Sequence, residues 1–263
     1  MLKSGCKGVA YETIQDRPGN LPCLKPMSEI AGRLSVQEGA KYIEKPFGGR
    51  GILLSGVPGV KSAKVVILGA GIVGSNALKM AVGLGSDVTI IDINTDRLAY
   101  LDDIFGNRIK TLFSTPSAIE NELAEADLVI GAVLIPGAAT PKIVKRKYLS
   151  SMKKGSVIVD VAVDQGGCFE TTKVTYHDSP VYDVDGVVHY CVGNMPGAVP
   201  YTSTLALTNA TLKYGLSIAG KGLEKAAADD PAIMKGINIY DGDCTYKSIA
   251  DLFAIKYKEL SFS

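Results

Sequence analysis

The sequence predicts an α/β fold, a doubly wound parallel sheet with a partial helical second lobe. Between Lys64 and Met152, short β-branched apolar runs alternate with segments whose apolar residues recur at helical spacing. After Tyr201 the pattern is helical and contains no repeats. The 263 residues, 46% apolar and 21% charged, are enough for one or two globular domains.

Charge and composition exclude several classes of protein. The 28 basic and 27 acidic residues leave a net charge of +1, which provides no field for nucleic acid or an anionic membrane. The longest uncharged stretch, 186–212, contains prolines and asparagines that would be unsatisfied in lipid, so no membrane span is expected. Residues 1–20 lack the apolar core of a signal peptide. Five cysteines without metal-ligand spacing predict neither a disulfide framework nor a metal site, and we expect a cytoplasmic protein.

The first predicted element is a helix over 27–45, which follows Pro26 and ends near Pro46. A glycine-rich loop then leads into the alternating region. The expected strands are 65–68, 88–91, 109–113, 128–133 and 157–161, and the expected helices between them are 72–84, 95–105, 117–124 and 143–152. Nearly continuous apolar runs of this length are typical of parallel strands buried on both faces.

The pattern loosens after Asp164 and ends in one more expected strand over 187–192. Helices are then expected over 201–219 and 223–228, after Pro231, and near 248–253, with a turn at Asp241 and Gly242. We therefore divide the chain into residues 1–25, the α/β region 26–199 and the helical region 200–263.

A glycine motif joins the first expected strand to its helix. Gly69, Gly71 and Gly74 form GxGxxG, which permits a tight turn, close approach to phosphates, and close packing of helix on strand. Asp92 ends the next strand, where a carboxylate binds ribose hydroxyls and repels a 2′-phosphate. This context favours a Rossmann site for NAD over NADP, although Arg97 nearby could hold a phosphate. The alternative is an ordinary strand-turn-helix with Asp92 as a carboxylate near a helix N-terminus.

Loops after the later strands should face the nicotinamide, because ligands bind at the carboxyl ends of the strands in such sheets. Asp164 follows one strand and is a candidate acid/base group, or else a turn-capping residue. Asn194 could position the carboxamide or substrate, or simply form a turn. Cys168 is expected to be a buried thiol rather than a nucleophile, and Ser28 is by default a helix N-cap.

The two histidines, His177 and His189, are not expected to be required proton donors. His177 lies in a polar segment that should be exposed.

With these residues assembled, the chain resembles L-alanine dehydrogenase, a family that shares its fold with the NAD-binding component of proton-translocating transhydrogenase. The matching phrases are AYETIQ (10–15), PMSEIAGR (26–33), GGRGILLSGVPGV (48–60), the glycine loop, DIN (92–94), ADLVIGAVLIPGA (126–138), VDVAVDQGGCFE (159–170) and NMPGAVPYTSTLALTNAT (194–211). The DQGGCFE and NMPGAVP phrases separate this family from the transhydrogenases.

The resemblance implies reversible oxidation of L-alanine by NAD to pyruvate and ammonium, with Asp164 as the catalytic aspartate. The implied cofactor contacts, besides the glycines, are Ser28, Asp92, Arg97, Ser114, Val133, Leu134, Val161, Lys173, Val192, Asn194 and Met195. The resemblance also implies that residues 1–25 are a remnant of the substrate domain, that 26–199 form the NAD-binding Rossmann domain, and that 200–263 form the helical part of the substrate domain. The family is commonly hexameric. Most of its N-terminal substrate domain has no counterpart here, so the chain is expected to be truncated and to lack the groups that hold the substrate carboxylate.

Three hypotheses follow. The chain is an alanine dehydrogenase polypeptide that works when a separate N-terminal chain supplies the other lobe, an NAD-binding module without turnover, or a transhydrogenase-like NAD domain. Apolar faces around Leu205, Leu212 and Leu216 should be exposed, which predicts a homo-oligomer.

Overall fold

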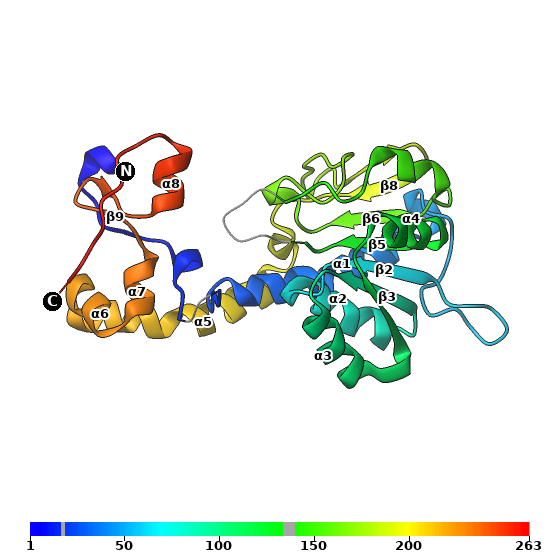
Figure 1. The fold of residues 1–263 in the computed structure, drawn as a ribbon, viewed down its shortest axis with the longest axis horizontal. Coiled ribbons are helices and arrows are strands. Elements are labelled where there is room, and N and C mark those ends of the chain that lie inside the picture. Colours follow the sequence, from blue (N-terminus) through cyan, green and yellow to red (C-terminus); the bar gives the residue numbers. More distant parts are fainter. Residues whose placement is uncertain (17–18, 134–139, 263) are drawn as a thin grey trace. The chain divides into compact units, whose positions relative to one another are not determined.

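The computed structural model describes residues 1–16, 19–133 and 140–262, so the expected contact Leu134 lies outside the described residues. The chain forms two compact units, Met1–Met27 with Val199–Ser263, and Ser28–Ala198 (Figure 1). That the first unit belongs to a substrate domain stays a prediction.

The second unit contains a seven-stranded sheet in the order β4-β3-β2-β5-β6-β8-β7. Its strands are β2 (Lys64–Leu68), β3 (Asp87–Asp92), β4 (Ile109–Phe113), β5 (Leu128–Gly131), β6 (Val157–Asp160), β7 (Val181–Val184) and β8 (Val187–Tyr190). All neighbouring strands are parallel except β7 and β8. From β2 the chain adds β3 and β4 on one side and then β5 and β6 on the other, so the strand order reverses between β2 and β5. A doubly wound sheet binds its ligand at this switch point.

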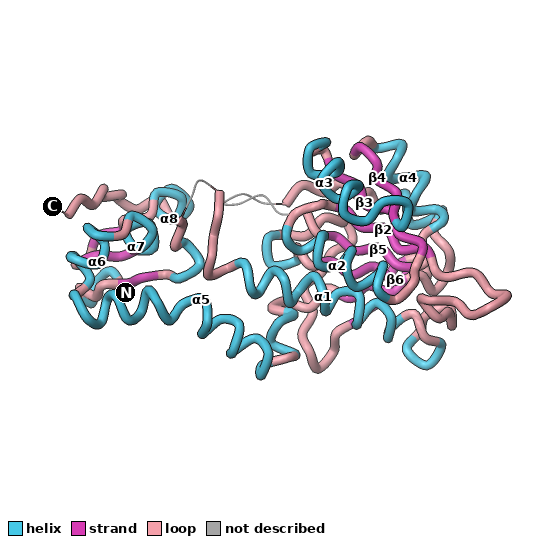
Figure 2. The backbone as a smooth tube through the Cα atoms, turned by 90° about the horizontal axis from the view of Figure 1, so that it is seen from below, coloured by secondary structure: helices cyan, strands magenta, loops and turns pink. Residues whose placement is uncertain are grey.

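Helices cover both faces of this sheet (Figure 2). They are α1 (Lys25–Tyr42), α2 (Ile72–Gly83), α3 (Thr95–Phe105) and α4 (Pro116–Glu125). Alternate residues of β2 serve the two faces: Val66 and Leu68 belong to the same buried cluster as Leu123 of α4, whereas a Cβ at Gly74 of α2 would lie 3.4 Å from Ile67. The predicted doubly wound α/β class is therefore confirmed.

The expectation for the region before β6 was wrong. Residues 143–152 do not form an α-helix; they contain a 3₁₀ helix at Arg146–Ser151. The backbone N–H of Val144 donates to the Cys168 carbonyl at 3.1 Å and its carbonyl accepts the Glu170 N–H at 2.9 Å, so this part of the chain pairs with a distant loop instead of forming helical hydrogen bonds. The edge strand β7 was also not predicted; it turns into β8 through Asp185 and Gly186, whose φ angles are 56° and 81°.

In its described residues, the first unit holds the α-helices α5 to α8 and a small sheet. The helices are α5 (Pro200–Lys221), α6 (Leu223–Asp229), α7 (Pro231–Gly236) and α8 (Lys247–Leu252), and the strands are β1 (Gly8–Val9), β9 (Ile237–Tyr240) and β10 (Asp243–Cys244). The predicted turn at Asp241 and Gly242 is confirmed, because both have positive φ and join β9 to β10, but the tail is not purely helical as expected.

The long helix α5 exposes an apolar face. Leu205, Leu212 and Leu216 are 50%, 53% and 63% exposed, as predicted.

Among the described residues, no helix combines the length and apolar character needed to cross a membrane.

Candidate active site

The turn between β2 and α2 leaves open space where a phosphate would lie. Gly69 has φ +103°, and a Cβ there would lie 2.7 Å from the Ala132 carbonyl oxygen; a Cβ at Gly74 would overlap the Gly69 carbonyl. The fold itself therefore requires these two glycines. A Cβ at Gly71 would meet nothing within 4 Å, although the first backbone N–H groups of α2 lie beside it. This open approach to a helix N-terminus fits a dinucleotide diphosphate.

Asp92 lies at the end of β3, beside the glycine turn. Its carboxylate accepts hydrogen bonds from the backbone N–H groups of Ala70, at 2.5 Å, and Asn94, at 2.8 Å. A carboxylate has about four acceptor positions, so two remain for ribose hydroxyls. Ser114, at the end of the adjacent strand β4, donates its backbone N–H to the Asp92 carbonyl at 2.9 Å. These contacts bring two of the predicted cofactor residues to one edge of the sheet.

Arg97 is held against the same turn. Its Nε donates to the Ala70 carbonyl and its Nη2 donates to Ser75 Oγ, both at 2.8 Å, while its guanidinium lies over the Tyr100 ring. These hydrogen bonds fix the Arg97 side chain against the glycine turn. Ser75 was not among the predicted contacts, although its Oγ also donates to the Gly71 carbonyl at 2.7 Å. Its signal in the sequence was a small hydroxyl residue directly after the third glycine.

Ser28 is not an N-cap as expected, because α1 begins at Lys25 and Ser28 is already inside its first turn. One turn further on, a Cβ at Gly32 would overlap the Val73 carbonyl, so α1 runs in close contact with the beginning of α2. This packing places Ser28 on the helix face that leads toward the glycine turn.

Asp164 and Asn194 meet, although thirty residues separate them in the sequence. Asn194 has φ 53° and donates its backbone N–H to Asp164 Oδ2 at 3.1 Å, and a Cβ at Gly193 would lie 2.9 Å from Asp164 Oδ1. Both side chains are exposed. His177 joins them, since its Nε2 is 3.3 Å from the Asn194 carbonyl oxygen, and it is exposed as predicted. The structure therefore assembles a carboxylate, an amide and an imidazole on two adjoining loops.

The remaining predicted contacts lie around this group. Val161 donates its backbone N–H at 3.0 Å to the carbonyl of Gly131, the last residue of β5. Val133 follows β5 in the sequence. Val192 and Met195 are buried on either side of the Asn194 turn. Lys173 is exposed and its contacts are with Tyr182, whose Oη accepts the Lys173 backbone N–H at 2.8 Å.

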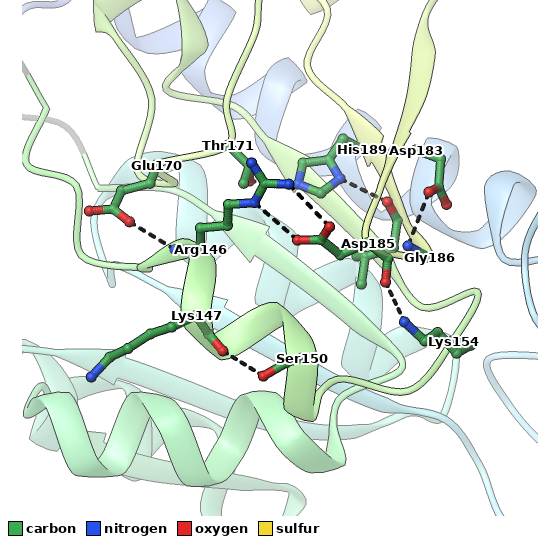
Figure 3. A network of polar contacts seen from close by, with 11 residues as sticks. Arg146, Lys147, Ser150, Lys154, Glu170, Thr171, Asp183, Asp185, Gly186 and His189 are labelled. Carbon is green, nitrogen blue, oxygen red and sulfur yellow. Dashed lines mark hydrogen bonds and ion pairs between the residues drawn. The ribbon is translucent and has the colours of Figure 1, made fainter.

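Cys168 and His189, which were not expected to take part in the reaction, are both buried. The Cys168 side chain is fully buried, as predicted, and burial raises the pKa of its thiol, so it remains protonated and unreactive. His189 is also fully buried: its Nε2 lies 2.8 Å from Thr171 Oγ1 and its Nδ1 lies 2.9 Å from the Val187 carbonyl oxygen (Figure 3). Burial lowers the pKa of His189, which favours the neutral ring.

Asp160 is not among the site residues expected from the sequence. It ends β6 and is fully buried, and burial raises the pKa of its carboxyl. It accepts hydrogen bonds from the backbone N–H groups of Ala162 and Cys168 and from the Thr172 hydroxyl. Its position immediately after an apolar strand and before the glycine pair was the only signal available from the sequence.

Comparison with known proteins shows the family. Residues 35–247 match the family model described as alanine dehydrogenase/PNT, C-terminal domain. The alanine dehydrogenase of Halomonas elongata is 56% identical over 259 residues, which are 98% of this chain and 70% of that protein. The alanine dehydrogenase of Bacillus subtilis is 58% identical over 254 residues, which are 96% of this chain and 67% of that protein.

Solved structures agree with the sequence comparison. An L-alanine dehydrogenase structure matches with a TM-score of 0.93 and 53% identity, covering 96% of this chain and 70% of that one. A transhydrogenase from Sinorhizobium meliloti matches with a TM-score of 0.79 at 23% identity, which shows a common fold alone. The glycine turn, the acid at the end of β3 and these relatives lead to one conclusion: the chain belongs to the alanine dehydrogenase/PNT family, whose alanine dehydrogenases are oxidoreductases that use NAD.

Proposed function

We propose that this chain binds NAD at the carboxyl end of its seven-stranded sheet and takes part in the interconversion of L-alanine and pyruvate. The observation that carries the proposal is the open space at Gly71, beside the N-terminus of α2 and next to Asp92. The diphosphate would lie against the first amides of α2, the adenosine ribose would bind Asp92, and the nicotinamide would extend toward Val133, Val161 and the Asn194 turn.

In the proposed reaction, L-alanine, NAD⁺ and water give pyruvate, ammonium, NADH and a proton. Bound NAD⁺ supplies the hydride acceptor. Asp164 would hold the amine of the substrate and take up or release its proton, because its exposed carboxylate is fixed by the Asn194 N–H. Asn194 would hold the carboxamide or the substrate with its side chain, while its backbone N–H binds Asp164.

Substrate binding also requires a cation for the alanine carboxylate and a base that titrates near neutral pH. In the described residues, Asp164 accepts the Asn194 N–H, and His177 contacts the Asn194 carbonyl oxygen rather than Asp164. We therefore propose that a separate polypeptide supplies the group that binds the substrate carboxylate. The alternative is a module that binds NAD without turnover. A transhydrogenase-like role is disfavoured by the DQGGCFE phrase and by the similarity to alanine dehydrogenases.

One experiment separates these possibilities. The chain is mixed with NAD⁺ and L-alanine while NADH absorbance is followed, and NADH affinity is measured in parallel by fluorescence titration. We expect binding in every case, and turnover after addition of the part of the Bacillus subtilis relative that this chain does not match. Turnover by the chain alone would refute the requirement for a second polypeptide, binding that never leads to turnover would favour the module, and absence of binding would refute the whole proposal.

We also propose that the chain forms homo-oligomers through the exposed face of α5, in the cytoplasm. The five cysteines are unpaired, which suits a reducing compartment. Light scattering should give a mass that is a multiple of 27.7 kDa. Leu212→Lys should reduce that mass, whereas Leu252→Lys, at another exposed leucine, should not. A lone 27.7 kDa species in the unsubstituted protein would contradict this proposal.

A further inference from the structure

The carboxylate of Asp160 takes no part in the chemistry proposed above, yet it lies at the centre of the loop that carries Asp164. Its side chain is fully buried at the end of β6. Oδ1 accepts the Ala162 N–H at 3.2 Å, and Oδ2 accepts both the Cys168 N–H, at 2.9 Å, and the Thr172 hydroxyl. Burial raises the pKa of this carboxyl, and the three donors oppose that shift because they stabilise the charged form.

These three donors determine the path of the loop. Asp164 lies between the first donor, Ala162, and the second, Cys168, in a 3₁₀ turn that ends at Gly166. Gly167 has φ +78°, and a Cβ there would overlap the Asp160 carboxylate, so the chain folds directly over the charge. The resulting turn points the Asp164 carboxylate at the Asn194 N–H.

The far end of the loop is anchored independently. Glu170 accepts the Arg146 backbone N–H at 2.8 Å and pairs with Lys145 at 3.0 Å, and Thr171 contacts the buried His189 (Figure 3). The segment between Ala162 and Cys168 has other contacts, from the Gln165 carbonyl to the Thr140 N–H at 2.9 Å and from the Gly166 carbonyl to Lys142, but Asp160 binds the amides at both of its ends. That segment contains Asp164.

An uncharged side chain of the same shape cannot replace this carboxylate. Both of its oxygens accept backbone N–H groups, which cannot rotate away or reverse their polarity. An asparagine offers one acceptor oxygen, so its NH₂ group would face either the Ala162 N–H or the Cys168 N–H. A buried donor would then be left without an acceptor, and the loop would move to satisfy it.

We propose that Asp160 is a positioning residue, whose buried carboxylate folds the 162–172 loop so that Asp164 is held on the Asn194 turn. The catalytic importance of this arrangement rests on the proposed function. The arrangement itself does not depend on the proposed function, because it is present in the chain without cofactor or substrate and can be measured in that state.

The test is amide hydrogen exchange by NMR on the full chain without cofactor. In Asp160→Asn, exchange of the Cys168 and Asn194 amides should rise about tenfold, the factor expected for losing one hydrogen bond to a charged group. The amide of Val66, in the central strand, should remain protected. Asp87→Asn is the matched control, because it makes the same substitution at an exposed carboxylate on the same sheet and should leave both amides unchanged.

A double-variant comparison separates positioning from general loosening. Asp164→Ala removes the acceptor of the Asn194 N–H, so adding Asp160→Asn to it should change Asn194 exchange by less than about twofold. An equal rise in both backgrounds would overturn the proposal. Thr172→Val removes one donor and keeps the charge, so it provides a milder variant if Asp160→Asn does not fold; it should raise Cys168 exchange to a smaller extent.

Unchanged exchange at Cys168 and Asn194 in a folded Asp160→Asn variant would overturn the proposal, as would unchanged Cys168 exchange in Thr172→Val. Failure of the unsubstituted chain to bind NADH would refute the proposed function while leaving these exchange results intact. The two failures are therefore distinguishable.

Discussion

Replacing Gly71 with alanine should separate cofactor binding from folding. A Cβ at this position would meet no atom within 4 Å, and the residue has φ −68° and ψ −161°, which alanine adopts without strain. The added methyl group would occupy the open space through which the diphosphate approaches the first amides of α2. The neighbouring glycines cannot make this distinction, because a Cβ at Gly74 would overlap the Gly69 carbonyl and damage the fold.

The magnitudes follow from these contacts. Alanine is a poorer N-cap than glycine, but it restricts the unfolded chain, and these opposing effects should leave the free energy of unfolding within about 1 kcal/mol of the original. Loss of one hydrogen bond between a backbone amide and a charged phosphate costs about 1.5–3 kcal/mol, which raises the NADH dissociation constant by about 10- to 150-fold.

The assay is calorimetric or fluorescence titration with NADH, together with denaturant unfolding of the same samples. Gly83→Ala is the matched control, because Gly83 ends the same helix and its Cβ would also meet nothing within 4 Å. The control should bind NADH like the unsubstituted chain. A folded Gly71→Ala variant whose affinity lies within about threefold of the original would refute the reasoning, because one lost amide–phosphate bond requires at least tenfold.

Three further predictions test other parts of the account. Asp92→Asn should weaken NADH binding by about 10- to 100-fold and reduce the preference over NADPH, because the charge that repels a 2′-phosphate is removed; an unchanged preference in parallel titrations would contradict this role. Because the pKa of His189 is lowered in the folded state, the unfolded state binds more protons below the ordinary pKa of 6.5. The free energy of unfolding should therefore fall as the pH drops below 6.5, by at most about 1.4 kcal/mol per pH unit. His189→Gln should flatten the pH dependence in denaturant titrations between about pH 7.5 and 5.5, and an unchanged slope would be evidence against it. Iodoacetamide should modify partly exposed Cys6 in the folded chain but spare buried Cys168, whose thiol pKa is raised; early labelling of the Cys168 peptide in a mass spectrum would show the opposite.

Local sequence pattern was sufficient for the parallel strands β2 to β6 and for the helices α2, α3 and α4. The run over 109–113 and the helical segment 95–105 have the same bounds in the structure as in the prediction. Continuous apolar runs and capping residues such as Asn94 encode these elements locally. Hairpins were harder, because strands of two to four residues are too short to show alternation. The turn at Asp241 and Gly242 was predicted without its strands β9 and β10, and the same turn signal at Asp185 and Gly186 was not used to predict β7.

The parts that could not be predicted depend on contacts between distant residues. Residues 143–152 have helical spacing, but Val144 pairs with Cys168, and this tertiary hydrogen bond overrides the local preference. The Asp160 network joins residues eight and twelve positions apart with no periodicity. For the site, glycine spacing predicted the turn, whereas the meeting of Asp164, Asn194 and His177 became visible only once the strands were assembled.

A crystal structure of the chain with bound NAD tests the central claim most directly. The account predicts diphosphate oxygens at about 3 Å from the backbone N–H groups at the beginning of α2, and the adenosine ribose hydroxyls hydrogen-bonded to Asp92. An ordered dinucleotide whose diphosphate lies away from Gly71, or whose ribose does not reach Asp92, would contradict it.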